Sequence, residues 1–474
     1  MPQAAPTQTE SASGMSRLTW TEKLGYGLGE FGSEMVWGMS ITFLLYFYTD
    51  VFGISAAAAG TLLMMARICD AMLDPVMGMI TERVTTRWGK FRPYLLFGTP
   101  VLGILLVLTF TTPNFGSGGK LLYAYLTYIS LGVVYTVVNL PYGALASTMT
   151  QEPDDRNALS AYRSFFARAG DGLFVGLATP ALVMALGRGN HAQGFQLTAV
   201  IYALLGSAAL WFTFSTCHER YVASGHVKLS IPQVVAALRH NGPFFLLMVS
   251  FLFFVSAAFT RNSASVYYMT YNVQRPELLG PLLASGTIAS LIGIPFSQPL
   301  ARRIGKRNTF IVGLAGWALS GVAMYLTPYV AVQLLFACYS IGYIAFGLSF
   351  GLFWSLISDT VEYSEWKTGV RAEGGIYSIA SFLMKLCSAM AGIAPAMVLS
   401  LSGYVPNTAQ SETALNGINW IMTVLPAVFG VMAITPLMLY RLDEALFARI
   451  VADLRRRRSA AHDGTSVRGR ANAA

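Results

Sequence analysis

Two carboxylates lie four residues apart inside a long, mostly apolar stretch of the chain. Asp70 and Asp74 belong to the segment 56–80, and Arg67 stands three positions before the first of them. On a helix, residues four apart share a face, so both carboxylates would face the same neighbour. Two negative charges inside a membrane are costly unless something positive binds them. The spacing therefore predicts a cation site, and the alternative is structural pairing of the two acids with nearby cations.

Further ionisable residues lie in apolar segments far from this one in the sequence. Glu34 belongs to the first such segment, Arg163 to the fifth and Lys385 to the eleventh. At a rise of about 1.5 Å per residue, Glu34 and Lys385 lie about as deep in their helices as Asp70 does. An ionisable residue at that depth is a functional candidate by default. We expect Glu34 to contact substrate and Lys385, which has no acidic residue within a turn, to act in coupling, while Arg163 is open to a structural or a functional interpretation.

The composition indicates a polytopic membrane protein. Of the 474 residues, 54% are hydrophobic and 12% are charged, whereas soluble proteins carry about twice that charged fraction. The apolar residues form about twelve runs long enough to cross a bilayer as helices. Lys and Arg gather in alternate loops, which places those loops and both termini in the cytoplasm. The net charge of +9 therefore does not indicate a nucleic-acid partner, and the polar start of the chain is not a signal peptide.

The chain divides into two similar halves. We expect a polar tail at 1–20, six-helix bundles at 21–216 and 243–442, a middle loop at 217–242 and a basic tail at 443–474. RWGK at 87–90 recurs as RIGK at 303–306, and the same offset of 216 residues (305 − 89) carries Asp70 and Asp74 onto Gly286 and Ser290. A repeated six-helix unit is typical of major facilitator transporters. The repeated turn therefore belongs to the fold, whereas the unrepeated acid pair reads as a site.

Four longer stretches carry a resemblance to one transporter family. They are ARICDAMLDPVMG (66–78), RWGKFRPYLLFGTP (87–100), YTVVNLPYGALAS (135–147) and SDTVEYSEWKTGVRAEGGIYS (358–378). On these stretches the chain resembles the glycoside–pentoside–hexuronide:cation symporters of the major facilitator superfamily. The resemblance extends over nearly all of residues 20–440. It implies an all-α membrane protein with about twelve transmembrane helices in two six-helix halves.

The resemblance also implies roles for individual residues. The cation site would comprise Asp70, Asp74 and Thr136, with Arg67 and Lys385 in coupling. The sugar would meet Glu34, Asn139 and Arg163. Because Gly143 stands where the melibiose branch carries a Trp, our own candidates for an aromatic face are Trp37, Trp354 and Tyr142. We further expect the inner gate to be latched by ion pairs between the halves, through Arg87, Lys90, Arg303, Lys306, Asp359 and Arg371.

Three positions depart from the family pattern. Leu73 stands where sodium-using relatives carry Asn, and its side chain has no oxygen to offer. A proton needs only one carboxylate with a raised pKa. We therefore favour H⁺ over Na⁺; if sodium is the coupling ion, its ligands would include Asp70 and Asp74. Asn139 and Gly143 differ from the melibiose-transporting branch, which argues for another sugar.

The predicted activity is secondary active symport of a sugar or glycoside with a cation, by alternating access, in the cell membrane. We expect a mono- to disaccharide substrate, no cofactor beyond the coupling ion, no nucleic acid and no obligatory protein partner. The alternative is a major facilitator that carries a lysolipid or another amphipathic molecule, and the polar groups at cavity depth favour a sugar. An enzyme is disfavoured, because the chain has no HExxH motif and no nucleophile–base set.

Overall fold

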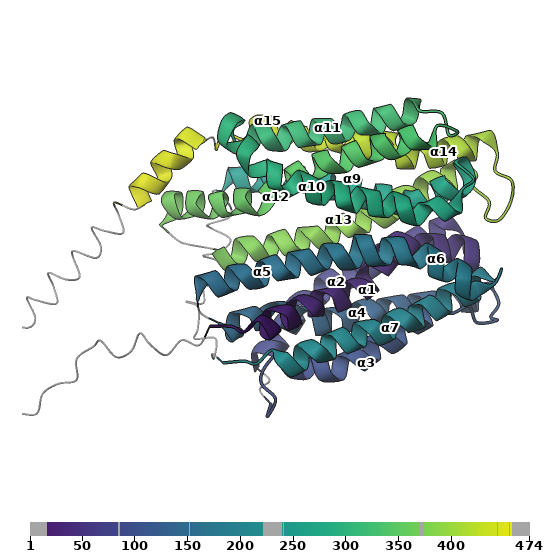
Figure 1. Ribbon diagram of the computed structural model, residues 1–474, viewed down its shortest axis with the longest axis horizontal. Helices are drawn as coiled ribbons and strands as arrows, with labels where there is room; N and C mark the ends of the chain where they lie inside the picture. Colours follow the sequence, from purple (N-terminus) through teal and green to yellow (C-terminus); the bar gives the residue numbers. More distant parts are fainter. Residues whose placement is uncertain are drawn as a thin grey trace, which may run out of the picture.

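The computed structural model describes residues 17–83, 86–150, 152–220, 239, 241–369, 373–442, 444–454 and 456, and within them the regular structure is helical (Figure 1). The N-terminal half comprises α1 (Trp20–Tyr46), η1 (Phe47–Phe52), α2 (Ala56–Arg83), α3 (Arg92–Thr109), α4 (Ser117–Met149), α5 (Pro153–Arg168), η2 (Ala169–Val175), α6 (Gly176–Gly187) and α7 (His191–Thr216). The C-terminal half comprises α9 (Gly242–Tyr267), η3 (Tyr268–Asn272), η4 (Pro276–Leu278), α10 (Leu279–Ile304), α11 (Lys306–Leu326), α12 (Val332–Thr368), α13 (Glu373–Leu401), α14 (Glu412–Met422) and α15 (Val424–Leu439).

Several helices continue through a π-helical turn into one longer rod. α1 runs on into η1, α5 runs through η2 into α6, and α9 runs on into η3. Within the described residues, ten helical stretches are long and apolar enough to cross a membrane. α2 and α13, with 28 and 29 residues, are not counted in these ten stretches, although each is as long as the spanning helices. The expectation of an all-α membrane protein is confirmed.

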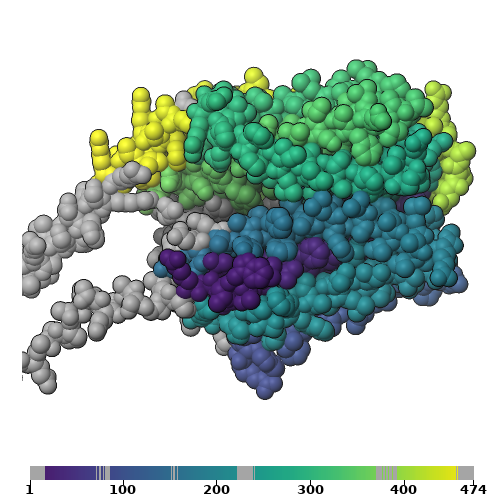
Figure 2. Space-filling view, viewed as in Figure 1, coloured from purple at the N-terminus to yellow at the C-terminus, as the bar shows by residue number. Residues whose placement is uncertain are grey.

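The two halves lie side by side as separate bundles. Helices coloured from purple through blue to the teal of α7 form one bundle, and the helices that follow in the colour series, up to yellow, form the other (Figures 1 and 2). The first turn of α1 and the helix that follows α15 lie at the same end of the molecule, at the left of Figure 1. We call this the terminal end. The opposite end, where η1 carries Asp50, is called the Asp50 end.

Small residues let the helices approach closely. A Cβ at Gly32 of α1 would lie 2.8 Å from the Gly206 carbonyl oxygen of α7, so this crossing requires glycine. Similar crossings join the two halves: a Cβ at Gly60 of α2 would lie 2.6 Å from that of Ala396 of α13, and one at Gly280 of α10 would lie 2.8 Å from the carbonyl oxygen of Leu177. Without a hydrophobic drive in lipid, such close backbone packing is a main source of helix association. Gly60 and Gly280 lie in the first turns of helices that begin at the Asp50 end.

The repeated basic turns share one structural device. Gly89 and Gly305 adopt φ values of 109° and 90°, which favour glycine. Each glycine packs against a carboxylate from the chain that follows the last helix of its own half. A Cβ at Gly89 would lie 2.5 Å from an oxygen of Glu219, and a Cβ at Gly305 would lie 2.5 Å from an oxygen of Glu444. Glu219 accepts three successive backbone N–H groups after Gly89, at 2.7–3.1 Å, and Glu444 accepts the Lys306 N–H at 2.7 Å. Each turn therefore fastens the third helix of a half to the chain after its sixth.

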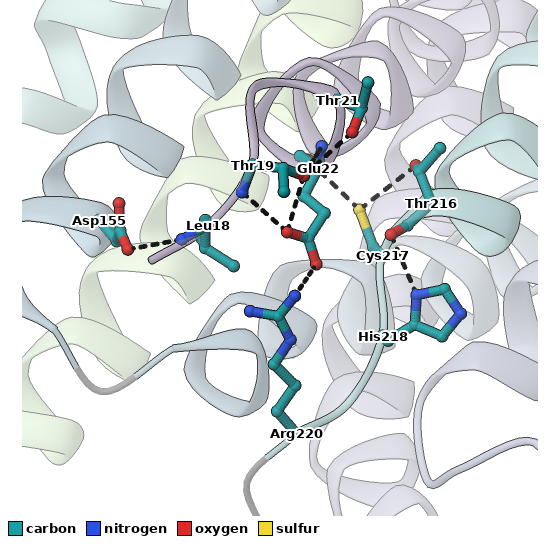
Figure 3. A network of polar contacts seen from close by, with 9 residues as sticks. All are labelled: Leu18, Thr19, Thr21, Glu22, Asp155, Thr216, Cys217, His218 and Arg220. Atoms are coloured by element: carbon teal, nitrogen blue, oxygen red, sulfur yellow. Dashed lines mark hydrogen bonds and ion pairs between the residues drawn. The ribbon is translucent and has the colours of Figure 1, made fainter. Parts of the chain in front are cut away.

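The start of α1 is fastened in a similar way at the terminal end (Figure 3). The Glu22 carboxylate accepts a hydrogen bond from Arg220 Nη2 at 2.6 Å, and the Asp155 carboxylate accepts one from the Leu18 N–H at 2.9 Å. Lys23 also pairs with Asp155 at 2.7 Å. The hydrogen bond from Lys23, helped by the Leu18 N–H, lowers the pKa of Asp155. These contacts hold α1 against α5 and the chain after α7.

Candidate cation and substrate sites

Arg67 and Asp70 form an ion pair in the interior of the N-terminal half. Arg67 Nη1 lies 3.0 Å from Asp70 Oδ2, and each side chain is 5% exposed. Because the two residues are three apart on α2, they share one face. Arg67 also donates a hydrogen bond to the Tyr128 hydroxyl of α4. Asp70 therefore has a counter-charge built into its own helix, and removing either partner would leave a buried charge uncompensated.

α4 covers this ion pair. The backbone of Gly132 lies directly against the Asp70 carboxylate, where a Cβ would overlap it. Thr136, one turn further along α4, is 2% exposed and lies on the same face of the helix as Gly132. A cavity of about 20 Å³ adjoins Arg67 and Tyr128. It is large enough for one water molecule, and it also touches Ser263 of α9 and Gly392 of α13. The polar centre of α2 thus borders the junction of the halves.

Three of the predicted residues lie outside the described parts. Asp74 belongs to α2, one turn beyond Asp70, and Lys385 belongs to α13. The structure does not describe either side chain, and Arg371 lies outside the described residues. Their roles remain predictions.

A second ion pair lies between α1 and α5. Arg163 Nε donates to Glu30 Oε2 at 2.8 Å, and Arg163 Nη2 donates to Glu30 Oε1 at 3.3 Å. Arg163 is 37% exposed although it lies roughly 15 Å along α5 from its first residue. Its guanidinium also lies 5.5 Å from the ring centroid of Tyr142. A bidentate arginine is thus held in place with part of its surface open.

Three residues of α4, four apart, continue this polar face. Tyr135 stacks on Trp37 of α1, with ring centroids 5.3 Å apart. Gly143 faces Arg163, since a Cβ there would lie 3.5 Å from Arg163 Nη1. Asn139 lies between them, and its buried Nδ2 has no hydrogen-bond partner within the part of the chain that the structure describes. A buried amide donor without a partner costs about 1–3 kcal/mol. A polar ligand would satisfy it.

Glu34 lies on α1 between Glu30 and Trp37. It is partly exposed, and its Cβ lies 2.9 Å from the position that a Cβ on Gly170 of η2 would take. The three α1 residues are spaced by four and three, so they lie on one face of the helix. The structure therefore brings Glu34, Arg163 and Asn139 to the same region of the N-terminal half, and a substrate role for them stays a prediction.

The cation side and this polar face meet at Trp37. The guanidinium of Arg67 lies 4.6 Å from the Trp37 ring centroid, within the range of a cation–π interaction. Trp37 therefore touches the partner of Asp70 and also stacks on Tyr135, which heads the row that contains Asn139. One aromatic ring joins the two candidate sites.

Two of the aromatic candidates differ in what they offer a sugar. Tyr142 is fully buried, stacks on Tyr26 at 4.9 Å and donates its hydroxyl to the Tyr26 carbonyl at 2.5 Å. It supports Arg163 and presents no open face, which differs from our expectation of a direct sugar contact. Trp354 of α12 is 40% exposed.

The predicted gate residues form contacts within each half. Lys306 pairs with Asp359 at 2.7 Å, and both belong to the C-terminal half, so this ion pair does not join the halves. Arg87 lies over the Trp88 ring at 4.0 Å and Lys90 over Phe91 at 5.3 Å, both within the same turn. Arg303 is exposed in the last turn of α10. A gating role for these residues stays a prediction.

Sequence reasoning did not assign a role to Tyr128 or to Asp50. Tyr128 binds Arg67 across 61 residues of sequence, a separation at which no periodic pattern links two side chains. Asp50 is an acid near the end of the first apolar segment, and its position alone was the available signal.

Comparison with known proteins agrees with this architecture. The family model described as "MFS/sugar transport protein" matches residues 25–444. The chain is 34% identical to the putative glycoside/cation symporter YagG of Escherichia coli (strain K12), over 97% of this chain and 100% of that protein. It is 35% identical to the isoprimeverose transporter of Lactiplantibacillus pentosus, over 95% of each. The chain belongs to the glycoside–pentoside–hexuronide:cation symporter family of the major facilitator superfamily.

A solved structure confirms the fold of this symporter-family member. A bacterial homolog to the human lysosomal transporter Spinster, in an inward-facing and occupied conformation, superposes with a TM-score of 0.64 at 15% sequence identity. The match covers 89% of this chain and 95% of that one. The family model and the named relatives show that the protein is a major facilitator transporter embedded in a membrane, and not an enzyme.

Proposed function

We propose that this protein carries a sugar or glycoside across the cell membrane together with a cation, by alternating access, with both termini in the cytoplasm. The observation that carries the proposal is the buried Arg67–Asp70 pair, in contact with a polar face through Trp37. Ionisable groups at this depth are costly in a membrane protein and usually serve transport. The named relatives, a putative glycoside/cation symporter and an isoprimeverose transporter, support the same substrate class.

The cation would bind at Asp70, with Asp74 and Thr136 as further ligands. While the site is empty, Arg67 neutralises Asp70. An arriving cation competes with the Arg67 guanidinium for the Asp70 carboxylate. Arg67 then keeps its cation–π contacts with Trp37 and Tyr128. A proton suits the site better than sodium, because Leu73 offers no side-chain oxygen. Lys385 would act in coupling, because its ammonium group would be attracted less strongly once a cation neutralises Asp70 and Asp74.

The substrate would bind at the polar face of α1, α4 and α5. Arg163, Glu34 and the unpartnered Asn139 amide offer hydrogen bonds of both kinds to sugar hydroxyls. Trp354 is the candidate for an aromatic contact from the other half. Because Trp37 touches Arg67, occupancy of the cation site changes the packing of the substrate site.

The test is uptake of a panel of labelled mono- and disaccharides into proteoliposomes, with an imposed proton or sodium gradient. We expect uphill uptake of at least one sugar under one gradient, and its loss in Asp70→Asn. Asp155→Asn is the matched control, because this buried acid fastens α1 outside the candidate sites. Uphill uptake that survives in Asp70→Asn refutes the cation site. If no sugar is taken up under either gradient while an amphipathic substrate is, the alternative function replaces this one.

A further inference from the structure

Asp50 joins the two halves of the molecule at the end opposite the termini. It lies in η1, is 7% exposed and belongs to the N-terminal half. Its Oδ1 accepts hydrogen bonds from the hydroxyls of Tyr271 and Tyr404, the latter at 2.5 Å. Both tyrosines belong to the C-terminal half, one in η3 and the other after α13. A single carboxylate therefore holds two elements of the opposite bundle.

The neighbours of Asp50 extend this junction. Thr49 donates to Asp50 Oδ2 at 2.6 Å and also lies 2.8 Å from the Tyr267 hydroxyl of α9. Asn407 Nδ2 donates to the Asp50 carbonyl oxygen at 2.5 Å, and the Asn407 N–H donates to the Tyr271 hydroxyl at 3.2 Å. Both the side chains of Thr49 and Asp50 and the backbone carbonyl of Asp50 therefore bind residues of the C-terminal half.

The backbone on both sides is shaped for these contacts. η1 is a π-helical turn, a feature frequent at functional sites, and it is followed by Gly53 with φ 82°. Asn407 adopts φ 58°, a left-handed conformation that is uncommon for a residue with a side chain. Such conformations persist where the surroundings enforce them, and here they direct the Asn407 amide at η1.

Close helix crossings lie around the same end. Gly60 of α2 meets Ala396 of α13, and Gly280 of α10 meets Leu177 of α6. At mid-depth, by contrast, Arg163 keeps 37% of its surface exposed. The halves are therefore packed together around Asp50, while the candidate substrate site keeps open surface.

We propose that Asp50 is the lock of a gate at this end of the transporter. Its bonds hold η1 against η3 and the segment after α13 while the substrate site is open towards the terminal end, and they break when the site opens at the Asp50 end. Water can replace each of these hydrogen bonds, because hydroxyl and carboxylate groups are both well hydrated. The net free energy of such an exchange is small, so the lock is reversible. This role rests on the alternating access proposed above.

The test measures access to a reporter cysteine without substrate or ion gradient. Cys69, Cys217, Cys338 and Cys387 are replaced by serine, and Ser40→Cys provides the reporter, because Ser40 lines the small cavity between the halves. A membrane-impermeant maleimide is added on the side opposite the termini, identified by a tag on the C-terminal tail. We expect Asp50→Asn to raise the labelling rate at least about tenfold over the parent.

Two further variants make the result decisive. Tyr271→Phe/Tyr404→Phe retains both rings and the carboxylate while removing two donors, so it should also raise the rate and decides the matter if Asp50→Asn does not fold. Glu22→Gln, which changes a buried acid within one half at the terminal end, should leave the rate unchanged. Equal rates in the parent and the tyrosine double variant overturn the lock. Because no sugar is used, failure of the uptake assay would leave this readout intact.

Discussion

The guanidinium of Arg67 packs on the indole of Trp37, 4.6 Å from its ring centroid, while its Nη1 binds Asp70 at 3.0 Å. One side chain of α2 therefore contacts the candidate cation ligand and an aromatic residue of the substrate face. A cation that takes Asp70 from Arg67 leaves the guanidinium with Trp37 and Tyr128 as its remaining partners. The short path between the two sites is a physical basis for coupling them.

Removal of Arg67 should destabilise the protein through Asp70. Arg67→Gln leaves a buried carboxylate without its counter-charge, and breaking a buried pair typically costs about 3–5 kcal/mol. Arg67→Gln/Asp70→Asn should recover most of that loss, because the second change removes the orphaned charge. Thermal unfolding in detergent measures both. A double variant no more stable than Arg67→Gln contradicts the compensation, and transport should stay absent in both variants.

Replacement of Asn139 should separate ligand binding from stability. Asn139→Leu removes a buried Nδ2 donor that has no hydrogen-bond partner among the described residues, so we expect the free protein to keep its stability or gain about 1 kcal/mol. The KM for the transported sugar should rise about tenfold or more. Asn241→Leu is the matched control: Asn241 donates to the Thr360 carbonyl at 2.9 Å and caps α9, so its loss should lower the unfolding temperature. A marked loss of stability in Asn139→Leu would count against a ligand at this amide.

The two turn carboxylates should differ in what they contribute. Glu219→Gln places an amide that is partly a donor against three backbone N–H groups, whereas Glu444→Gln faces the single Lys306 N–H. Hydrogen bonds to charged groups contribute about 1.5–3 kcal/mol each. We expect the larger fall in unfolding temperature for Glu219→Gln, measured side by side in the same detergent. Equal falls in unfolding temperature would show that the number of N–H donors does not determine how much each carboxylate stabilises its turn.

Acid should weaken the junction of α1 with α5 through Asp155. Its pKa is lowered in the folded protein by the Lys23 hydrogen bond and the Leu18 N–H. A group with a depressed folded pKa stabilises above its unfolded pKa, about 3.9 for Asp, and that contribution is lost as pH falls through the folded value. The unfolding temperature should therefore fall more steeply below about pH 4 in the parent than in Asp155→Asn. Parallel curves would contradict this role of Asp155.

The sequence allowed the prediction of parts of the site that follow from helix periodicity. Arg67 and Asp70 are three apart on one helix, so their pairing was among the expected alternatives. The pair of Glu30 and Arg163 spans 133 residues, and nothing in either segment indicates the other. The pairing of Lys306 with Asp359, 53 residues further along the chain, was hidden for a related reason, because charge alone does not say which acid supplies the partner.

The π-helical turns were also beyond sequence reasoning. The apolar pattern predicts continuous spans at 25–50 and 158–187, which include most of the first π-helical turn and all of the second, and an inserted residue in a turn leaves that pattern nearly unchanged. The turns nevertheless decide where Asp50 is directed. Helix spans and the repeated basic turn follow from composition and spacing, whereas the direction of individual side chains depends on the partner helix.

The contact between each basic turn and the carboxylate after its half's last helix has a consequence for folding during synthesis. Glu219 follows the sixth helix and Glu444 follows the last, yet each fastens the loop before its half's third helix. During synthesis, the turn at Gly89 stays open until all six helices of the first half have left the ribosome. This contact thus ties closure of the turn to the completion of the six helices of the first half.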